Sequence, residues 1–131
     1  MDNSKRATIT ATADGEGRFI RNSASRRQYG HVRTRIEPNQ KGKGIEIIYE
    51  ASCDEIPERF SNSVTDGVRV SLGGDMVIGH PAVDGHPIDD IIVHVVGGSF
   101  HKTDSSDLAF KMAAIFAMRD AMKKAEPVEI K

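Results

Sequence analysis

Alanines recur at every fourth position in one segment near the end of the chain, and this stripe constrains the fold more than any other feature. It consists of Ala109, Ala113, Ala117 and Ala121. Because residues i and i+4 share one face of an α-helix, the spacing predicts a helix, and such small side chains let its backbone approach a sheet closely. We expect Asp104 as the N-cap and Asp107 as its capping-box partner, with Ser105 and Ser106 as helix-terminus residues rather than nucleophiles. The helix pattern is completed by Leu108, Met112, Ile115, Met118, Met122, Lys123 and Lys124.

A second apolar stripe predicts another helix earlier in the chain. Its members are Phe60, Val64, Val68 and Leu72. Pro57 suits the first position of this helix, because its missing N–H would have no partner there. Gly67 weakens the helix and the pair Gly73-Gly74 ends it, so residues 75–87 are expected to form a loop.

Alternating polar and apolar residues predict five strands, at residues 7–13, 17–22, 29–37, 45–49 and 88–96. Asp14-Gly15 is expected to form the turn between the first two. In the third, His31, Arg33 and Arg35 share one face. The order β-β-β-β-α-β-α predicts an α+β sandwich with both helices on one face of the sheet, in a single domain spanning residues 1–131.

The charge balance excludes two classes of protein. The 131 residues carry 18 Lys and Arg against 19 Asp and Glu, which fits neither a uniformly basic nucleic-acid coat nor a disordered acidic tail.

The longest apolar run, residues 91–96, is far shorter than the ~18 residues of a membrane span, and residues 1–6 lack the apolar region of a secretory signal. With Cys53 as the one cysteine, we expect a reduced, cytoplasmic setting in which this thiol is buried or half-buried.

Phosphate-binding motifs are missing from the sequence. Only Gly74 and Gly79 have the glycine spacing of a P-loop, and His80-Pro81 follow where Lys and Ser or Thr are required. We therefore expect no nucleotide cofactor in this chain.

Three histidines and an aspartate form a candidate metal-binding set, comprising His80, Asp84, His86 and His94. Imidazole and carboxylate groups suit zinc or a related ion, but this spacing matches no recurrent ligand pattern. We expect no metal site here, and a metal-dependent enzyme using these residues stays an alternative.

Positive charge is concentrated in the first third of the chain. Residues 1–44 contain ten basic and four acidic residues, a net charge of +6, so the remainder carries −7. A local excess of this kind can attract phosphate even when the total charge is close to zero.

Two connections between predicted elements have the chemistry of RNA recognition. One carries Arg21, Arg26 and Arg27, whose guanidinium groups suit phosphate, and the other is residues 97–102. Gln28 can both donate and accept hydrogen bonds, and His101 can donate from either nitrogen when protonated. If both connections lie at one end of the sheet, they form an RNA-contacting tip.

Several segments, in the same order along the chain, resemble domain IV of bacterial elongation factor G. Residues 17–32 contain Gln28-Tyr29-Gly30-His31-Val32, like the family's Gln-Tyr/Phe-Gly-His-Val. Residues 85–90, Gly-His-Pro-Ile-Asp-Asp, are similar to its Gly-Tyr-Pro-Val-Val-Asp. Residues 98–111 begin Gly-Ser-Phe-His-Lys-Thr-Asp-Ser-Ser, like its Gly-Ser-Tyr-His-x-Val-Asp-Ser-Ser, and residues 124–128 resemble its Lys-Ala-Lys-Pro-Val. The resemblance covers nearly the whole chain.

The resemblance implies a fold like the second domain of ribosomal protein S5, including a left-handed β-α-β crossover. It also implies a function. In the family this domain enters the decoding site of the small ribosomal subunit and helps move tRNA and mRNA during translocation, while GTP and Mg²⁺ bind in a preceding GTPase domain. We therefore expect no catalytic residue and no metal in this chain, and a monomer whose partners are rRNA, tRNA and mRNA.

By the same resemblance, two loops form the RNA-binding and ribosome-binding tip. The residues implied are Ser23, Arg26, Arg27, Gln28, Tyr29, Gly30, Ser99, His101 and Lys102. Two departures from the family leave a ribosome-recycling or ribosome-protection paralogue as an alternative. Residues 24–27, Ala-Ser-Arg-Arg, replace the usual Gly-Gly-x-Gly, and the segment 75–84 is longer than the usual link.

Overall fold

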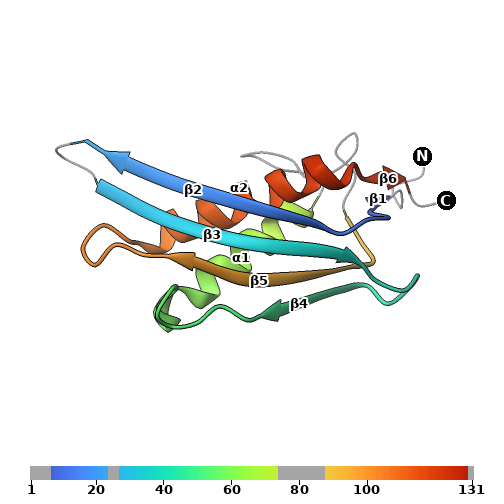
Figure 1. Cartoon of the computed structure of the whole chain (residues 1–131), viewed down its shortest axis with the longest axis horizontal. Coiled ribbons are helices and arrows are strands. Elements are labelled where there is room, and N and C mark those ends of the chain that lie inside the picture. Colours follow the sequence, from blue (N-terminus) through green and yellow to red (C-terminus); the bar gives the residue numbers. More distant parts are fainter. Residues whose placement is uncertain (1–6, 24–26, 74–87, 130–131) are drawn as a thin grey trace.

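A four-stranded sheet covered on one face by two helices forms the body of the domain (Figure 1). The computed structural model describes residues 7–23, 27–73 and 88–129, so the predicted loop at 75–87 lies outside the described residues. The elements are β1 (Ala7–Thr8), β2 (Ala13–Asn22), β3 (Arg27–Pro38), β4 (Ile45–Tyr49), the 3-10 helix η1 (Glu58–Phe60), α1 (Ser61–Leu72), β5 (Ile91–Ser99), α2 (Asp107–Ala125) and β6 (Val128–Glu129). The predicted α+β order is confirmed, with β6 as an additional short strand.

The sheet has the strand order β2-β3-β5-β4. The strands β2 and β3 are antiparallel, with registers from Ala13↔Ile36 to Asn22↔Arg27, and β3 is also antiparallel to β5. The strands β4 and β5 are parallel neighbours, and the chain passes between them through α1. This is the β-α-β unit that the resemblance implies.

The predicted turn at Asp14-Gly15 is wrong, because β2 runs through both residues. Gly15 is a glycine for another reason: a Cβ on it would come within 2.0 Å of the Ala117 carbonyl oxygen. The glycine serves close packing of strand against helix rather than a change of direction.

The first and fifth predicted strands differ from the observed ones at their ends. Of the first, Ala7–Thr8 forms β1, which pairs with β6 in a separate two-stranded sheet, and Ala13 already belongs to β2. The fifth begins at Ile91 rather than Ile88, since Asp90 has a φ of 55° in the left-handed region, and it extends to Ser99.

The stripe predicted for the first helix is confirmed, since Phe60, Val64, Val68 and Leu72 are all buried. Pro57 is not in this helix: it precedes η1, and α1 begins at Ser61. Gly67 allows the two helices to approach, because its Cβ would lie 2.5 Å from the Lys111 carbonyl oxygen.

The alanine stripe of α2 is fully buried against the sheet, as predicted. Its N-cap is Ser106 rather than Asp104: the Ser106 backbone is extended and its hydroxyl accepts a hydrogen bond from the Ala109 amide. Asp107 is then the first helical residue, and Leu108 is 55% exposed instead of buried.

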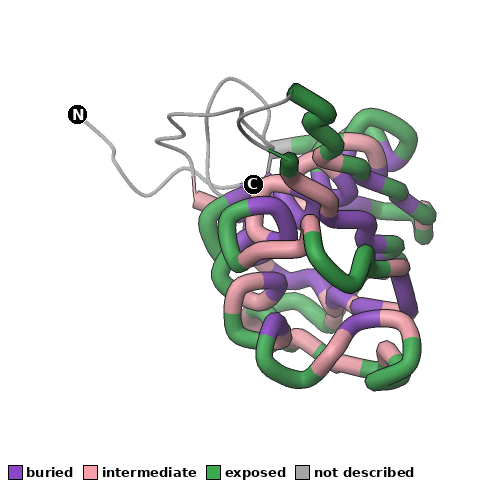
Figure 2. The backbone as a smooth tube through the Cα atoms, turned by 90° about the vertical axis from the view of Figure 1, so that its left-hand side faces the viewer, coloured by how far each residue is buried: buried purple, intermediate pink, exposed green. Residues whose placement is uncertain are grey.

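Buried residues are concentrated where the helices face the sheet (Figure 2). Phe60 and Phe110 stack there with ring centroids 4.8 Å apart. Cys53 is exposed, contrary to expectation, because it lies in a turn after β4. No helix among the described residues is long and apolar enough to cross a membrane.

Candidate nucleic-acid interface

The ends of β2 and β3 and the segment between β5 and α2 meet at one end of the sheet (Figure 1). The Tyr29 amide donates a 3.0 Å hydrogen bond to the Asp104 carbonyl oxygen, and Tyr29 forms a parallel bridge with Ser105. The condition set for an RNA-contacting tip, that both connections share one end, is therefore met. We call the described residues of these two segments, residue 23 with 27–31 and residues 99–106, the tip.

A series of hydrogen bonds through Ser99 and His31 holds the Tyr29 side chain in place. The Tyr29 hydroxyl lies 2.7 Å from Ser99 Oγ, and the same oxygen of Ser99 lies 2.8 Å from His31 Nδ1. His31 is buried, and its Nε2 lies 2.5 Å from a carboxylate oxygen of Glu16 on β2. This hydrogen bond from His31 holds the pKa of Glu16 below its usual range, although partial burial opposes the shift.

Ser106 joins the start of α2 to the other tip segment. Its hydroxyl accepts from the Ala109 amide at 3.1 Å and donates to the side-chain oxygen of Gln28. The side-chain oxygen of Gln28 thereby accepts a hydrogen bond inside the protein.

The loop around His101 is built by hydrogen bonds to its own backbone and ring. The His101 amide donates to Ser105 Oγ at 2.9 Å, and the ring nitrogen Nδ1 accepts from the amides of Thr103 and Asp104 at 3.3 and 3.2 Å. The ring lies 6.2 Å from the Tyr29 ring, centroid to centroid, and its side chain is 51% exposed. The expectation that His101 can donate from either nitrogen when protonated stays a prediction.

The predicted tip residues divide by exposure. Ser23, Arg27, His101 and Lys102 are exposed, Gln28, Tyr29 and Ser99 are half-buried, and Gly30 is buried. Arg26 lies outside the described residues. A Cβ on Gly30 would lie 2.3 Å from the Ala109 carbonyl oxygen. Gly30 therefore packs against the backbone of α2 and is not part of the exposed surface of the tip.

The face of the sheet opposite the helices carries a network of ion pairs. The predicted basic face of β3 is here, with Arg35 paired to Asp14 at 2.8 Å and Arg33 to Glu55 at 2.7 Å. Glu55 also accepts a hydrogen bond from the Gly98 amide at 2.8 Å. The pKa of Glu55 is lowered mainly by this hydrogen bond and, to a smaller extent, by the one from Arg33. Alternation identified the basic residues, but their acidic partners depend on the fold: the strand register places Asp14 beside Arg35, and the turn after β4 places Glu55 beside Arg33.

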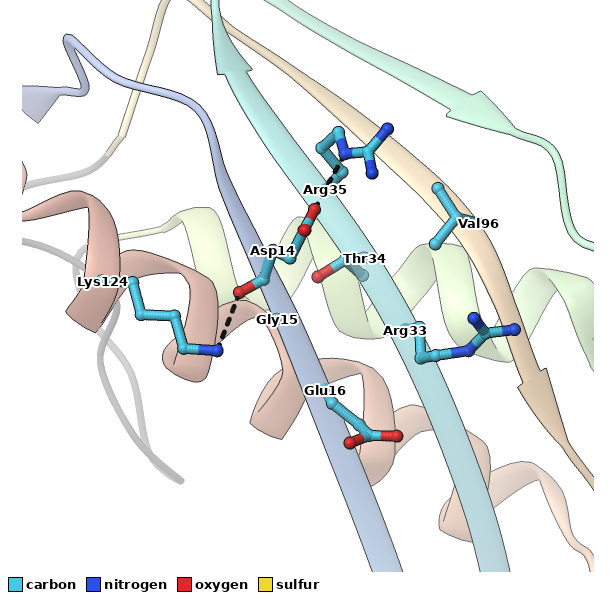
Figure 3. Close-up of a pocket in the computed structure, with 8 residues that line it drawn as sticks. All are labelled: Asp14, Gly15, Glu16, Arg33, Thr34, Arg35, Val96 and Lys124. Atoms are coloured by element: carbon cyan, nitrogen blue, oxygen red, sulfur yellow. Dashed lines mark hydrogen bonds and ion pairs between the residues drawn. The ribbon is translucent and has the colours of Figure 1, made fainter.

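A shallow pocket of about 310 Å³ lies beside β2 (Figure 3). Its lining comprises Asp14, Gly15, Glu16, Arg33, Thr34, Arg35, Val96 and Lys124. Lys124 donates to the Asp14 carbonyl oxygen at 3.2 Å, and the Glu16 amide donates to Asp120 at 2.9 Å, so α2 caps the free edge of this strand. The charged groups of the pocket are paired with one another or with neighbours, and we assign it no ligand.

The candidate metal set is represented among the described residues by His94 alone, since His80, Asp84 and His86 lie outside them. Its ring nitrogens each lie 2.5 Å from a carboxylate oxygen, Nδ1 from Glu50 and Nε2 from Glu37. Within the described ranges no group of three potential ligands is arranged to hold a metal ion. His94 on β5 therefore links Glu37 on β3 to Glu50, the residue that follows β4.

Comparisons with known proteins agree with the resemblance seen in the sequence. The family model described as elongation factor G, domain IV, matches residues 4–126. Elongation factor G of Aquifex pyrophilus is 42% identical over 121 residues, which are 92% of this chain and 16% of that protein. A crystal structure from Thermus thermophilus is similar with a TM-score of 0.79 at 30% identity, covering 95% of this chain and 18% of that one. The chain thus spans less than one fifth of the length of these relatives.

Proposed function

This chain belongs to the family of elongation factor G, domain IV, and from that premise we propose that it is the ribosome-binding tip domain of a translational GTPase. In this proposal the tip enters the decoding site of the small ribosomal subunit and promotes movement of tRNA and mRNA. GTP and Mg²⁺ bind elsewhere in the longer protein, which acts in the cytoplasm as a monomer.

One observation carries the proposal: the amide of Tyr29 and the carbonyl oxygen of Asp104 join the two tip segments at one end of the sheet. This bond brings exposed Arg27, His101 and Lys102 to the same end of an elongated domain. Cationic and hydrogen-bonding groups at the end of a rigid support suit contact with RNA phosphates and sugars. Ser23, Arg26 and Gln28 complete the proposed contact surface.

The paired terminal strands support the orientation. The strands β1 and β6 pair with each other at the end of the domain away from the tip (Figure 1). A larger protein attached through that end leaves the tip free to reach a partner.

The proposal includes the detailed fold of the second domain of ribosomal protein S5. Figure 1 supports a left-handed crossover, since β4 and β5 run the same way, α1 lies behind them and β5 lies above β4. A right-handed unit with the helix on that side would place β5 below β4.

The test uses the full-length factor with His101→Ala. We expect slower translocation with nearly unchanged ribosome-stimulated GTP hydrolysis, because hydrolysis is proposed to occur in another domain. Gln40→Ala, an exposed change in the turn at the opposite end of the sheet, is the matched control and should leave both activities unchanged. Normal translocation by His101→Ala at wild-type stability would overturn the tip assignment.

A recycling or protection paralogue is the second candidate, favoured by the non-glycine sequence Ala-Ser-Arg-Arg at residues 24–27. Peptide synthesis and subunit-splitting assays with the full-length protein separate the two roles. Subunit splitting without support of peptide synthesis would replace the translocase proposal by this one.

A further inference from the structure

The turn that follows β4 is docked on the part of β5 that leads into the tip (Figure 1). Residues 52–56 close this turn through the Ser52 carbonyl oxygen, which accepts hydrogen bonds from the amides of Glu55 and Ile56 at 3.0 and 2.9 Å. The Ile56 side chain is buried, and its Cδ1 would lie 3.1 Å from a Cβ on Gly98. The backbone on both sides of the Glu55 side chain is therefore held in place.

Gly98 has a buried backbone amide that lies beyond the reach of the neighbouring strand. Within the described residues, β4 pairs with β5 as far as Tyr49 and Val95, so Gly98 follows the last paired position. The carboxylate oxygen Oε1 of Glu55 accepts a hydrogen bond from the Gly98 amide at 2.8 Å, and Arg33 donates to the same oxygen at 2.7 Å. Because a buried N–H needs an acceptor, the Glu55 side chain supplies for Gly98 what a longer β4 would supply.

Two glycines make room for this carboxylate. A Cβ on Gly97 would lie 2.4 Å from Glu55 Oε1 and 2.3 Å from Arg33 Nη2. A Cβ on Gly98 would lie 2.0 Å from the His31 carbonyl oxygen. The register between β3 and β5 shifts directly after Arg33, which interrupts the regular ladder at this point. A side chain from outside the ladder can therefore determine where the end of β5 lies.

The Gly98 amide is one residue away from the tip. Ser99 follows it directly, and Ser99 Oγ lies 2.7 Å from the Tyr29 hydroxyl and 2.8 Å from His31 Nδ1. A displacement of Gly98 would therefore change both of these contacts. Glu55 itself lies outside the two segments that form the tip.

Resting on the function proposed above, we propose that Glu55 is a positioning residue for the tip. Its carboxylate contacts no RNA: it holds the end of β5 through the Gly98 amide, and thereby keeps Ser99 and the segment after it in the orientation that contact with RNA requires. The interaction depends on a hydrogen-bond acceptor at this place rather than on negative charge. Glu55→Gln, which retains a side-chain oxygen, therefore replaces the wild-type residue, whereas Glu55→Ala does not.

The geometry is tested on this chain without RNA, by NMR of the backbone amides. Glu55→Ala removes the acceptor, so we expect the Gly98 amide to exchange its hydrogen with solvent roughly tenfold faster. We also expect the amide signals of Tyr29 and of residues 99–106 to shift. If the changed signals are confined to residues 52–56 and to Gly98 with its two neighbours in β5, the inference is overturned.

Two further variants are the controls. Glu55→Gln should keep the wild-type signals of the tip, because its side-chain oxygen can still accept from Gly98 and Arg33. Asp54→Ala removes a carboxylate from an exposed residue of the same turn, whose side chain accepts no hydrogen bond from the described residues, and should also keep them.

The consequence for function is tested with the full-length factor. Glu55→Ala should slow translocation by roughly three- to tenfold, while ribosome-stimulated GTP hydrolysis stays close to wild type. Glu55→Gln should restore most of the rate, and Asp54→Ala should match the wild type. Thermal melting verifies that each variant is folded. If Glu55→Ala does not fold, Glu55→Asp replaces it in both experiments, because its shorter side chain keeps the charge but does not reach the Gly98 amide.

The outcomes separate this inference from the function beneath it. Wild-type translocation by a folded Glu55→Ala factor would overturn the positioning role while the proposed function stands. Slow translocation by Glu55→Ala and Glu55→Gln with unchanged tip signals would indicate a direct charge contact and would also overturn it. If the tip signals shift as expected but the wild-type factor promotes no translocation, the proposed function is wrong, and the effect of Glu55 on the geometry of the tip is confirmed.

Discussion

Gly17 lies so close to Ala113 that a Cβ on the glycine would come within 2.1 Å of the Ala113 carbonyl oxygen. The same relationship holds between Gly15 and Ala117, at 2.0 Å. Where β2 and α2 are in contact, the strand thus has glycines and the helix has alanines, so neither surface carries a large side chain. The helix can then lie almost against the backbone of the strand, with its N-terminal end next to the tip.

Replacing Gly17 by Ala should therefore destabilise the domain strongly. The added methyl group meets backbone atoms that cannot rotate away, and we expect the free energy of unfolding to fall by about 3 kcal/mol. Urea denaturation followed by circular dichroism measures this loss. Gly42→Ala is the matched control: its φ of 83° is strained for alanine, but its Cβ has open space, so about 1 kcal/mol is expected. Equal losses for both variants would show that steric contact with α2 is not the cause.

The link through His94 should make stability depend on pH. Burial of the ring opposes its charge, but hydrogen bonds to Glu50 and Glu37 outweigh burial and raise the pKa of His94 above the usual 6.5. A folded-state pKa above the unfolded value means that this contribution is complete below about pH 6.5 and is lost as the pH rises through the raised pKa.

Removing one carboxylate tests that dependence. Glu50→Gln should flatten the decline in unfolding free energy above about pH 6.5, because the pKa of His94 moves back toward its usual value. Glu46→Gln is the matched control, because Glu46 is an exposed residue of β4 whose carboxylate accepts a hydrogen bond from Asn39. This variant should keep the wild-type slope of unfolding free energy against pH. Urea denaturation at a series of pH values gives both curves, and identical slopes in wild type and Glu50→Gln would contradict the prediction.

The cap of α2 gives a third test. Ser106→Ala removes the acceptor for the Ala109 amide and the donor to Gln28, so we expect a loss of about 1 to 2 kcal/mol in unfolding free energy. Asp104→Ala, at the cap position expected from sequence, should cost less because its carboxylate contacts the exposed Thr103 and His101 side chains. Thermal and urea denaturation would reject this assignment if the larger loss followed Asp104→Ala.

Periodicity predicted the two helices and the face that each one buries, because those patterns depend on neighbours along the chain. Periodicity did not predict the role of residues whose position depends on contacts with parts of the chain distant in sequence. Gly15 resembles part of an Asp-Gly turn until α2 is placed beside it, and Leu108 fits the helical pattern but is exposed at the start of α2. The resemblance selected the tip residues as a group. Pairing of Ser99 with Tyr29 and His31 became visible only through the register of β3 and β5.

The contribution of Arg27 to ribosome binding should be mainly electrostatic. Arg27 is exposed at the start of β3 and forms no ion pair with the described residues, so its guanidinium is available for phosphate. Each phosphate contact releases condensed counterions, and Arg27→Ala in the full-length factor should lower the slope of log affinity against log salt by roughly 0.7 to 0.9. Arg69→Ala is the matched control, since Arg69 is also exposed but lies in the last turn of α1, at the end away from the tip. Binding measured over a range of salt concentrations should separate the two arginines, and an unchanged slope for Arg27→Ala would mean that this residue only keeps the tip hydrated.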